Sequence, residues 1–172
     1  MELETKMTPL LNFIFSFTLA LILHELGHLA AARLCRVPVT AMSLGWGPRL
    51  YSRTLSNINC QLRLLPIGAF VQMDMGVFRT RSINKQLLVL SAGVGVNLAL
   101  ALITWGTLFG VLNLGLAIGN SLPVYQQDGW KSAIVVCRRL LGRSSALAEW
   151  TITIIGGAMA LAVFVRALFA VS

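Results

Sequence analysis

Two histidines and a glutamate lie close together in the segment LILHELGHLAA, as His24, Glu25 and His28. They include both histidines of the chain. On a helix, residues four positions apart share a face, so both imidazoles would point to one spot, while Glu25 would lie about 100° round the helix from His24. This is the HExxH spacing of zinc sites in which two histidines bind the metal and the glutamate deprotonates a water molecule. The spacing therefore predicts a Zn²⁺ site with His24 and His28 as ligands and Glu25 as the catalytic base.

The surroundings of this motif make a purely structural role for it unfavourable. The chain has 172 residues, of which 56% are hydrophobic and only 12% charged, and its mean hydropathy is +0.77. This composition leaves too few polar residues to cover a soluble surface and predicts an α-helical polytopic membrane protein. A charged residue at the centre of a bilayer costs about 2.5–3.5 kcal/mol or more, so three ionisable groups there need a compensating partner. A metal ion is such a partner.

The apolar runs predict about four transmembrane helices within a single domain that covers residues 1–172. Residues 87–127 contain no charged side chain, and this stretch is too long for one span and suits two spans joined by a turn. Gly110, Asn113 and Gly115 are turn-forming residues near its middle. The predicted spans are residues 8–32, 87–110, 114–137 and 150–171.

Basic residues flank the apolar runs and predict how the chain is oriented. Between the first two spans they are Arg33, Arg36, Arg49, Arg53, Arg63, Arg79, Arg81 and Lys85, and after the third span they are Arg138, Arg139 and Arg143. The positive-inside rule puts both segments in the cytosol and both termini outside, so HELGH and Asp128 lie in the cytosolic half of the bilayer. Because these charges set topology and lack interleaved aromatic residues, we expect the lipid bilayer, and no nucleic acid, as a partner.

Residues 37–75, between the first two spans, show a different pattern. Apolar and polar residues alternate from Asn57 to Leu64, which is the period of a strand. The preceding RLYSRTL and a turn at Ser56–Asn57 predict that this strand is half of a β-hairpin. We therefore expect a small membrane-associated sheet on the cytosolic side, whose edge offers an extended substrate a place to add as a strand.

A catalytic zinc site usually has three protein ligands and keeps a fourth position for water. Apart from Glu25, Asp128 is the only acidic residue inside a predicted span. It lies in GNSLPVYQQDGW, where Asn120 and Pro123 interrupt a helix, and a membrane tolerates irregular backbone only where protein or a wet cavity surrounds it. Asp128 is therefore the favoured third ligand. The alternative is Glu149, at a membrane boundary, which would indicate a different class of membrane HExxH peptidase.

Several further segments fall into an order that resembles a known family. GNSLPVYQQDG carries an Asn-x-x-Pro-x4-Asp-Gly pattern, and SAGVGVN carries a Gly-x-x-x-Asn pattern at Gly93 and Asn97. LGWGP and LLPIGAFVQM are similar to two segments of a membrane-associated sheet in the same family. With HELGH, these segments resemble the site-2 proteases, the intramembrane zinc metalloproteases of peptidase family M50. The resemblance covers roughly residues 19–134.

The resemblance implies a three-helix catalytic core plus one further helix, with Zn²⁺ held by His24, His28 and Asp128 and with Glu25 as the catalytic residue. It implies that Asn97 orients the substrate or the oxyanion, and an interhelical hydrogen bond is the alternative role. It also implies cleavage of a transmembrane protein or peptide substrate in regulated intramembrane proteolysis, in a bacterial inner membrane. We expect a near-minimal form of the family without a PDZ domain.

Two other interpretations remain open. Closely spaced glycines, such as Gly106 and Gly110 or Gly115 and Gly119, allow helices to pack tightly within the chain or, alternatively, in a homodimer. A zinc transporter or a non-proteolytic zinc-binding scaffold would also need a metal site in the membrane. Transport would require further metal-binding residues along a pathway, and a scaffold would have no need of Glu25.

Overall fold

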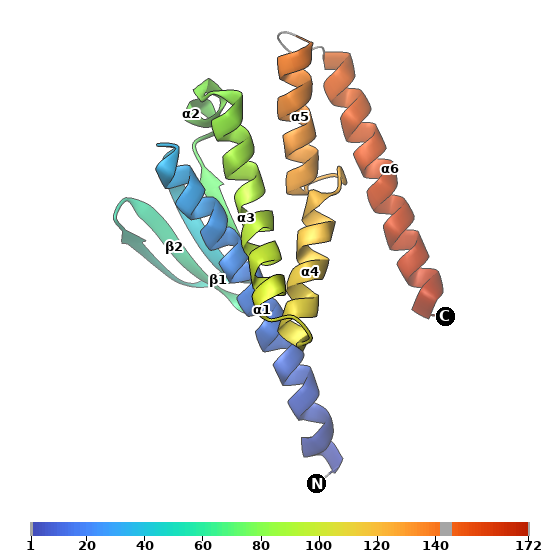
Figure 1. Cartoon of the computed structure of the whole chain (residues 1–172). Coiled ribbons are helices and arrows are strands. Elements are labelled where there is room, and N and C mark those ends of the chain that lie inside the picture. The colour runs from blue at the N-terminus through green and yellow to red at the C-terminus, as the bar shows by residue number, and fades with distance from the viewer. Residues whose placement is uncertain (1, 142–145, 172) are drawn as a thin grey trace.

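The computed structural model describes residues 2–141 and 146–171, and Arg143 of the basic residues named above lies outside this range. The chain is mostly helical, with one β-hairpin between its first two helices (Figure 1). Helices α1, α3, α4 and α5 pack against one another, and α6 packs against α5. In chain order the elements are α1 (Glu2–Leu34), β1 (Val39–Leu55), β2 (Ile58–Met73), α2 (Met75–Thr80), α3 (Ile83–Ile103), α4 (Leu108–Ser121), α5 (Asp128–Leu140) and α6 (Ala146–Val171).

The helices have the surface of a membrane protein. Two of those described are long and apolar enough to span a membrane, namely Thr8–Leu34 of α1 and Ile83–Ile103 of α3. The shorter α4 and residues Ala146–Ala162 of α6 are also apolar. Large apolar side chains cover their outer faces, and Leu147, for example, is 80% exposed. Such faces are unfavourable in water and favourable in lipid. The total of four spans remains a prediction.

The turn between the second and third predicted helices lies earlier than the sequence suggests. Helix α3 ends at Ile103 and α4 begins at Leu108, so the predicted turn around Gly110 is wrong. Gly106 has a φ of +81°, which favours glycine, and the Thr107 hydroxyl accepts a hydrogen bond from the Gly110 N–H at 3.0 Å and so caps α4. Gly110 lies in the first turn of α4, where a Cβ would overlap the Thr104 carbonyl oxygen.

The third predicted helix is interrupted, as the sequence around Pro123 indicates. Residues 122–127, which we call the break, are not helical and separate α4 from α5. Helix α6 lies against the break, and the Tyr125 N–H donates a hydrogen bond to its Gly156 carbonyl oxygen at 3.1 Å. A Cβ on Gly156 would lie 2.8 Å from the Pro123 carbonyl oxygen. The missing side chain at Gly156 therefore allows α6 to approach the break closely.

The hairpin turn is at the predicted position. Strands β1 and β2 are antiparallel, and Leu55 pairs with Ile58 across a two-residue turn. The two turn residues, Ser56 and Asn57, have φ values of +49° and +65°. Positive φ at both central residues is the geometry that matches the twist of a two-residue hairpin, and asparagine tolerates it well. The prediction of a hairpin in this segment is confirmed.

The long hairpin also folds over itself, which the sequence did not indicate. Residues 41–44 of β1 pair with residues 59–62 of β2 on one side and with residues 69–72 of β2 on the other. Gly45 and Gly68 have φ values of +87° and +90° near the bends in the two strands. The last part of β2 thereby becomes an outer edge of the sheet, and it lies beside α1 (Figure 1).

A small apolar core joins the helices next to the site described below. It contains Ala31, Ala32, Cys35, Val37, Phe78, Val89, Leu90 and Val135. These residues come from α1, the short α2, α3 and α5 and from the segment after α1. The three cysteines are free, and Cys35 packs in this core.

Candidate metal centre

His24 and His28 lie on one face of α1 and turn toward α3. Both are buried, with 4% and 5% of their surface exposed. Helix α3 can lie against them because it has a glycine at the crossing point. A Cβ on Gly93 would lie 2.5 Å from His28 Nε2 and 2.7 Å from His24 Nε2. Gly93 therefore leaves open the space in which the two ring nitrogens meet.

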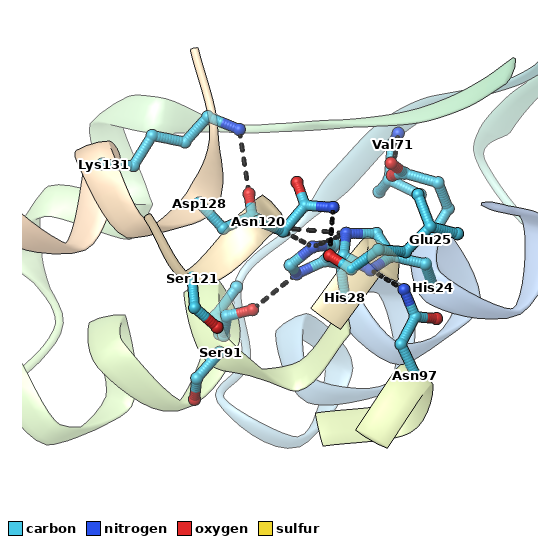
Figure 2. Close-up of polar contacts among 12 residues, drawn as sticks. His24, Glu25, His28, Val71, Ser91, Asn97, Asn120, Ser121, Asp128 and Lys131 are labelled. Atoms are coloured by element: carbon cyan, nitrogen blue, oxygen red, sulfur yellow. Dashed lines mark hydrogen bonds and ion pairs between the residues drawn. The ribbon is translucent and has the colours of Figure 1, made fainter. Parts of the chain in front are cut away.

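Asp128 completes the group from the other half of the chain (Figure 2). It is the first residue of α5, directly after the break, and it is 6% exposed. Its Oδ2 atom lies 3.1 Å from His24 Nε2 and 2.9 Å from His28 Nε2, and the two Nε2 atoms are 3.1 Å apart. Among the residues described, these three are the only group of three or more His, Cys, Asp or Glu side chains placed to hold a metal ion.

Glu149, the alternative third ligand, forms an ion pair with Arg138 instead. Its two carboxylate oxygens accept hydrogen bonds from Arg138 at 2.6 Å and 2.8 Å. This bidentate ion pair joins the end of α5 to the start of α6. The structure therefore brings Asp128, and not Glu149, to the two histidines.

Each member of the group has one partner behind it. His28 Nδ1 lies 2.7 Å from the Val89 carbonyl oxygen, and His24 Nδ1 lies 3.1 Å from the Asn97 side-chain amide. Lys131 Nζ donates to Asp128 Oδ1 at 3.0 Å, so the second carboxylate oxygen, Oδ2, is the one that faces the histidines. Sequence reasoning missed Val89, whose backbone carbonyl leaves no trace in residue type. It also missed Lys131, although a lysine three residues after a buried aspartate on a helix is a signal that could have been used.

The donor atoms fit Zn²⁺. A carbonyl oxygen only accepts, so the contact to Val89 requires the proton of His28 to be on Nδ1 and leaves a lone pair on Nε2. That lone pair faces the carboxylate oxygen of Asp128 at 2.9 Å. Two electron-rich atoms this close require a proton or a cation between them. Two imidazole nitrogens and one carboxylate oxygen form a donor set that catalytic zinc sites use.

Glu25 stands beside this group on the side of a cleft. Its Oε2 atom accepts a hydrogen bond from the Val71 N–H of β2 at 2.9 Å, so the outer edge of the hairpin touches the HExxH helix (Figure 2). The cleft has a volume of about 480 Å³ and is lined by Glu25, His28, Val71, Asp128 and by apolar side chains such as Phe70 and Phe78. Glu25 therefore lines the same cleft as His28 and Asp128.

A family model places the sequence among known proteins. The model described as peptidase family M50 matches residues 12–111, which is 100 of the 172 residues of the chain. The chain belongs to peptidase family M50. The matched range contains His24, Glu25, His28 and Asn97 and ends before Asp128. In this M50 chain, the position of Asp128 beside the histidines is therefore an observation from the structure and is not part of the family match.

Relatives of this M50 chain carry related names. A protein of Neisseria meningitidis serogroup A, provisionally named a zinc metalloprotease, is 33% identical over 131 residues, which are 68% of this chain and 29% of the relative. A protein of Clostridium perfringens with the same provisional name is 32% identical over 98 residues, or 52% of this chain and 29% of the relative. A chloroplast protein of Arabidopsis thaliana, provisionally named a membrane metalloprotease, is 30% identical over 119 residues, or 62% of this chain and 26% of the relative. The M50 chain thus spans less than a third of the length of each.

Proposed function

We propose that this M50 chain is the catalytic core of an intramembrane zinc metalloendopeptidase, which hydrolyses peptide bonds in or near transmembrane segments of membrane proteins. One observation carries the proposal. His24, His28 and Asp128 point their donor atoms at one place, within 3.1 Å of one another, and Glu25 lies next to them on a cleft. Family membership and the provisional names of the relatives support the same activity.

In the proposed mechanism, His24, His28 and Asp128 hold Zn²⁺. When bound, the ion polarises the scissile carbonyl and lowers the pKa of a water molecule to about 7. Glu25 accepts the proton of the attacking water and transfers it to the nitrogen of the leaving amine. The Val71 N–H orients the Glu25 carboxylate from the hairpin side.

The same contact suggests how a substrate is held. A transmembrane helix hides its carbonyl groups in internal hydrogen bonds, so it must unwind before hydrolysis. Residues 69–72 of β2 pair with β1 on one side only, and the Val71 N–H points away from that pairing toward Glu25. An unwound substrate that adds to this edge as a strand would pass beside Glu25 and the apolar lining of the cleft. We propose that this cleavage serves regulated intramembrane proteolysis.

The proposed setting is a bacterial inner membrane, with both termini outside and the site in the cytosolic half. The basic residues between α1 and α3 support this orientation through the positive-inside rule. A homodimer is a further proposal. A Cβ on Gly115 or Gly119 of α4 would meet no atom within 4 Å, so this face has room for another helix.

The alternative function is a zinc-binding membrane scaffold or transporter without proteolysis. Transport would be expected to use several metal-binding stations, whereas the described part of the chain has one such group. A scaffold would have no use for the Glu25 carboxylate in the lining of the cleft. The enzyme is therefore the better-supported proposal.

The test compares the wild type with Glu25→Gln and Asp128→Ala, measuring zinc content of the purified protein in detergent and cleavage of a panel of single-span membrane segments. We expect about one zinc per chain in the wild type and in Glu25→Gln, and much less in Asp128→Ala. Of these three proteins only the wild type should cut, because Glu25→Gln removes the proton acceptor and Asp128→Ala removes a metal ligand. Asp74→Asn, an acid outside the site, serves as the control that cuts normally. Cleavage by Glu25→Gln at the wild-type rate, or a wild type without zinc, would refute the proposal.

A further inference from the structure

Asn97 is placed where it can decide which nitrogen of His24 carries the proton. It lies on α3 one turn after Gly93, and its side chain is fully buried. The amide group of Asn97 lies 3.1 Å from His24 Nδ1 (Figure 2). Its Oδ1 atom has no hydrogen-bond partner among the residues described. His24 Nδ1 therefore depends on this one amide.

The two histidines differ in what stands behind them. His28 faces the Val89 carbonyl, which only accepts, and its tautomer is fixed with the proton on Nδ1. His24 faces a side-chain amide, which donates through nitrogen and accepts through oxygen. The two orientations of that amide have nearly the same shape and differ by a half-turn about the last side-chain bond. Each orientation selects a different tautomer of His24.

Only one of these tautomers can bind a metal through Nε2. When the amide nitrogen faces His24, the imidazole proton is on Nε2, and it can be donated to Asp128 Oδ2 at 3.1 Å. When the amide oxygen faces His24, the proton moves to Nδ1 and the Nε2 lone pair is free. Metal-ligating histidines usually donate their other N–H to a fixed acceptor, which orients the ring and raises its basicity.

We propose that Asn97 is a positioning residue for zinc binding: with its amide oxygen toward His24 it accepts the Nδ1 proton and so leaves the Nε2 lone pair of His24 free for the metal. The inference rests on the proposed function, because it assumes that the group binds zinc. In this proposal Asn97 acts on the metal ligand His24, and it does not need to contact the substrate. A leucine at this position would leave His24 Nδ1 unpaired, whereas an aspartate would supply an acceptor in either orientation.

Zinc affinity tests the proposal, measured on the full chain in detergent by competition with a chromophoric chelator. We expect Asn97→Leu to bind zinc about 10–100-fold more weakly than the wild type, as is typical when the outer partner of a ligand is lost. Asn97→Asp should stay within a few-fold of the wild type or bind more tightly. The matched control is Asn113→Leu, because Asn113 is also a fully buried helical asparagine with an unpartnered Oδ1 atom, and its amide donates to the Phe109 carbonyl oxygen far from any ligand in sequence. Its zinc affinity should not change.

A second readout reports the tautomer directly. The chain has only two histidines, so a ¹⁵N-histidine-labelled protein without a histidine tag gives one set of ring signals for each. We expect both histidines to carry the proton on Nδ1 when zinc is bound, because both would then bind the metal through Nε2. In zinc-loaded Asn97→Leu, the His24 Nδ1–H lacks its acceptor, so its ring signals should shift from their wild-type positions, whereas those of His28 should not.

The outcomes separate this inference from the proposed function. Equal zinc affinity in wild type and Asn97→Leu, or unchanged His24 ring signals in the zinc-loaded variant, would overturn the role of Asn97 and leave the protease proposal standing. A wild type that binds no zinc would overturn both. Equal losses of affinity in Asn97→Leu and Asn113→Leu would show a general packing effect and would also overturn it.

Discussion

The two halves of the site are built in different ways. His24 and His28 come from an uninterrupted helix, so their relative position follows from helix geometry alone. Asp128 directly follows the break, where no regular structure fixes the backbone, and contacts from α4 and α6 hold this part of the chain instead. The first half therefore takes its geometry from one helix and needs a glycine opposite it and partners for its ring nitrogens, whereas the second half needs separate contacts to place its backbone. Changes at these two kinds of support should have different effects.

The largest effect is expected where α3 crosses the histidines. In Gly93→Ala, the added Cβ would lie 2.5 Å from His28 Nε2 and would occupy the place where the donor atoms meet. We expect zinc affinity to fall by more than about 100-fold, beyond the loss typical of outer partners. Gly95→Ala is the matched control, because a Cβ there meets nothing within 4 Å. If Gly93→Ala binds zinc like Gly95→Ala in the same competition assay, the close crossing of α1 and α3 is incorrect.

A smaller effect is expected where α5 begins. A Cβ on Gly129 would overlap the Ser121 carbonyl oxygen and lie 2.5 Å from that of Leu122. The backbone of the break must move to admit it, at a cost of about 1–3 kcal/mol, so Gly129→Ala should lower the unfolding temperature and weaken zinc binding about tenfold. Gly119→Ala adds the same methyl group to α4 in open space and should be neutral or stabilising. Thermal unfolding with and without zinc measures both variants, and equal behaviour would contradict the close contact.

The smallest effect is expected at the charge behind Asp128. Lys131 holds Oδ1 of Asp128 at 3.0 Å, but 46% of its side chain is exposed, and exposed ion pairs contribute about 0.2–1 kcal/mol. Lys131→Met should therefore weaken zinc binding by at most about fivefold. Lys131→Arg keeps the charge and should restore most of the loss. A tenfold or greater loss in Lys131→Met would mean that this lysine supports the aspartate more than its exposure suggests.

Much of this arrangement could be predicted because it depends on local signals. A few neighbouring residues determine each of three features: the spacing of His24 and His28, the hairpin turn at Ser56–Asn57 and the interruption near Pro123. Asp128 could be favoured because a lone carboxylate in an apolar stretch is costly. The structure brings it to the histidines, and its role as a ligand remains a proposal.

The rest depends on contacts between distant segments. Gly110 looked like a turn residue but lies in a helix, since its missing side chain serves a close backbone contact to Thr104. The folding of the hairpin over itself requires residues 41–44 to pair on both sides, and alternation of residue types does not specify a second partner. The contact of the Val89 carbonyl with His28 could not be predicted for another reason: every residue has a backbone carbonyl, so the residue type gives no signal.

The contact of α6 with the break has a consequence for how the protein is made. Among the described residues, α6 supplies no member of the His24, His28 and Asp128 group, yet its Gly156 carbonyl accepts a hydrogen bond from the Tyr125 N–H, shortly before Asp128. Because a chain is synthesised from its N-terminus, all three donor residues leave the ribosome before Gly156 does. A nascent chain that already contains His24, His28 and Asp128 therefore still lacks the hydrogen bond from Tyr125 to Gly156. Packing of α6 against the break should therefore follow the synthesis of all three residues and complete the support of the backbone before Asp128.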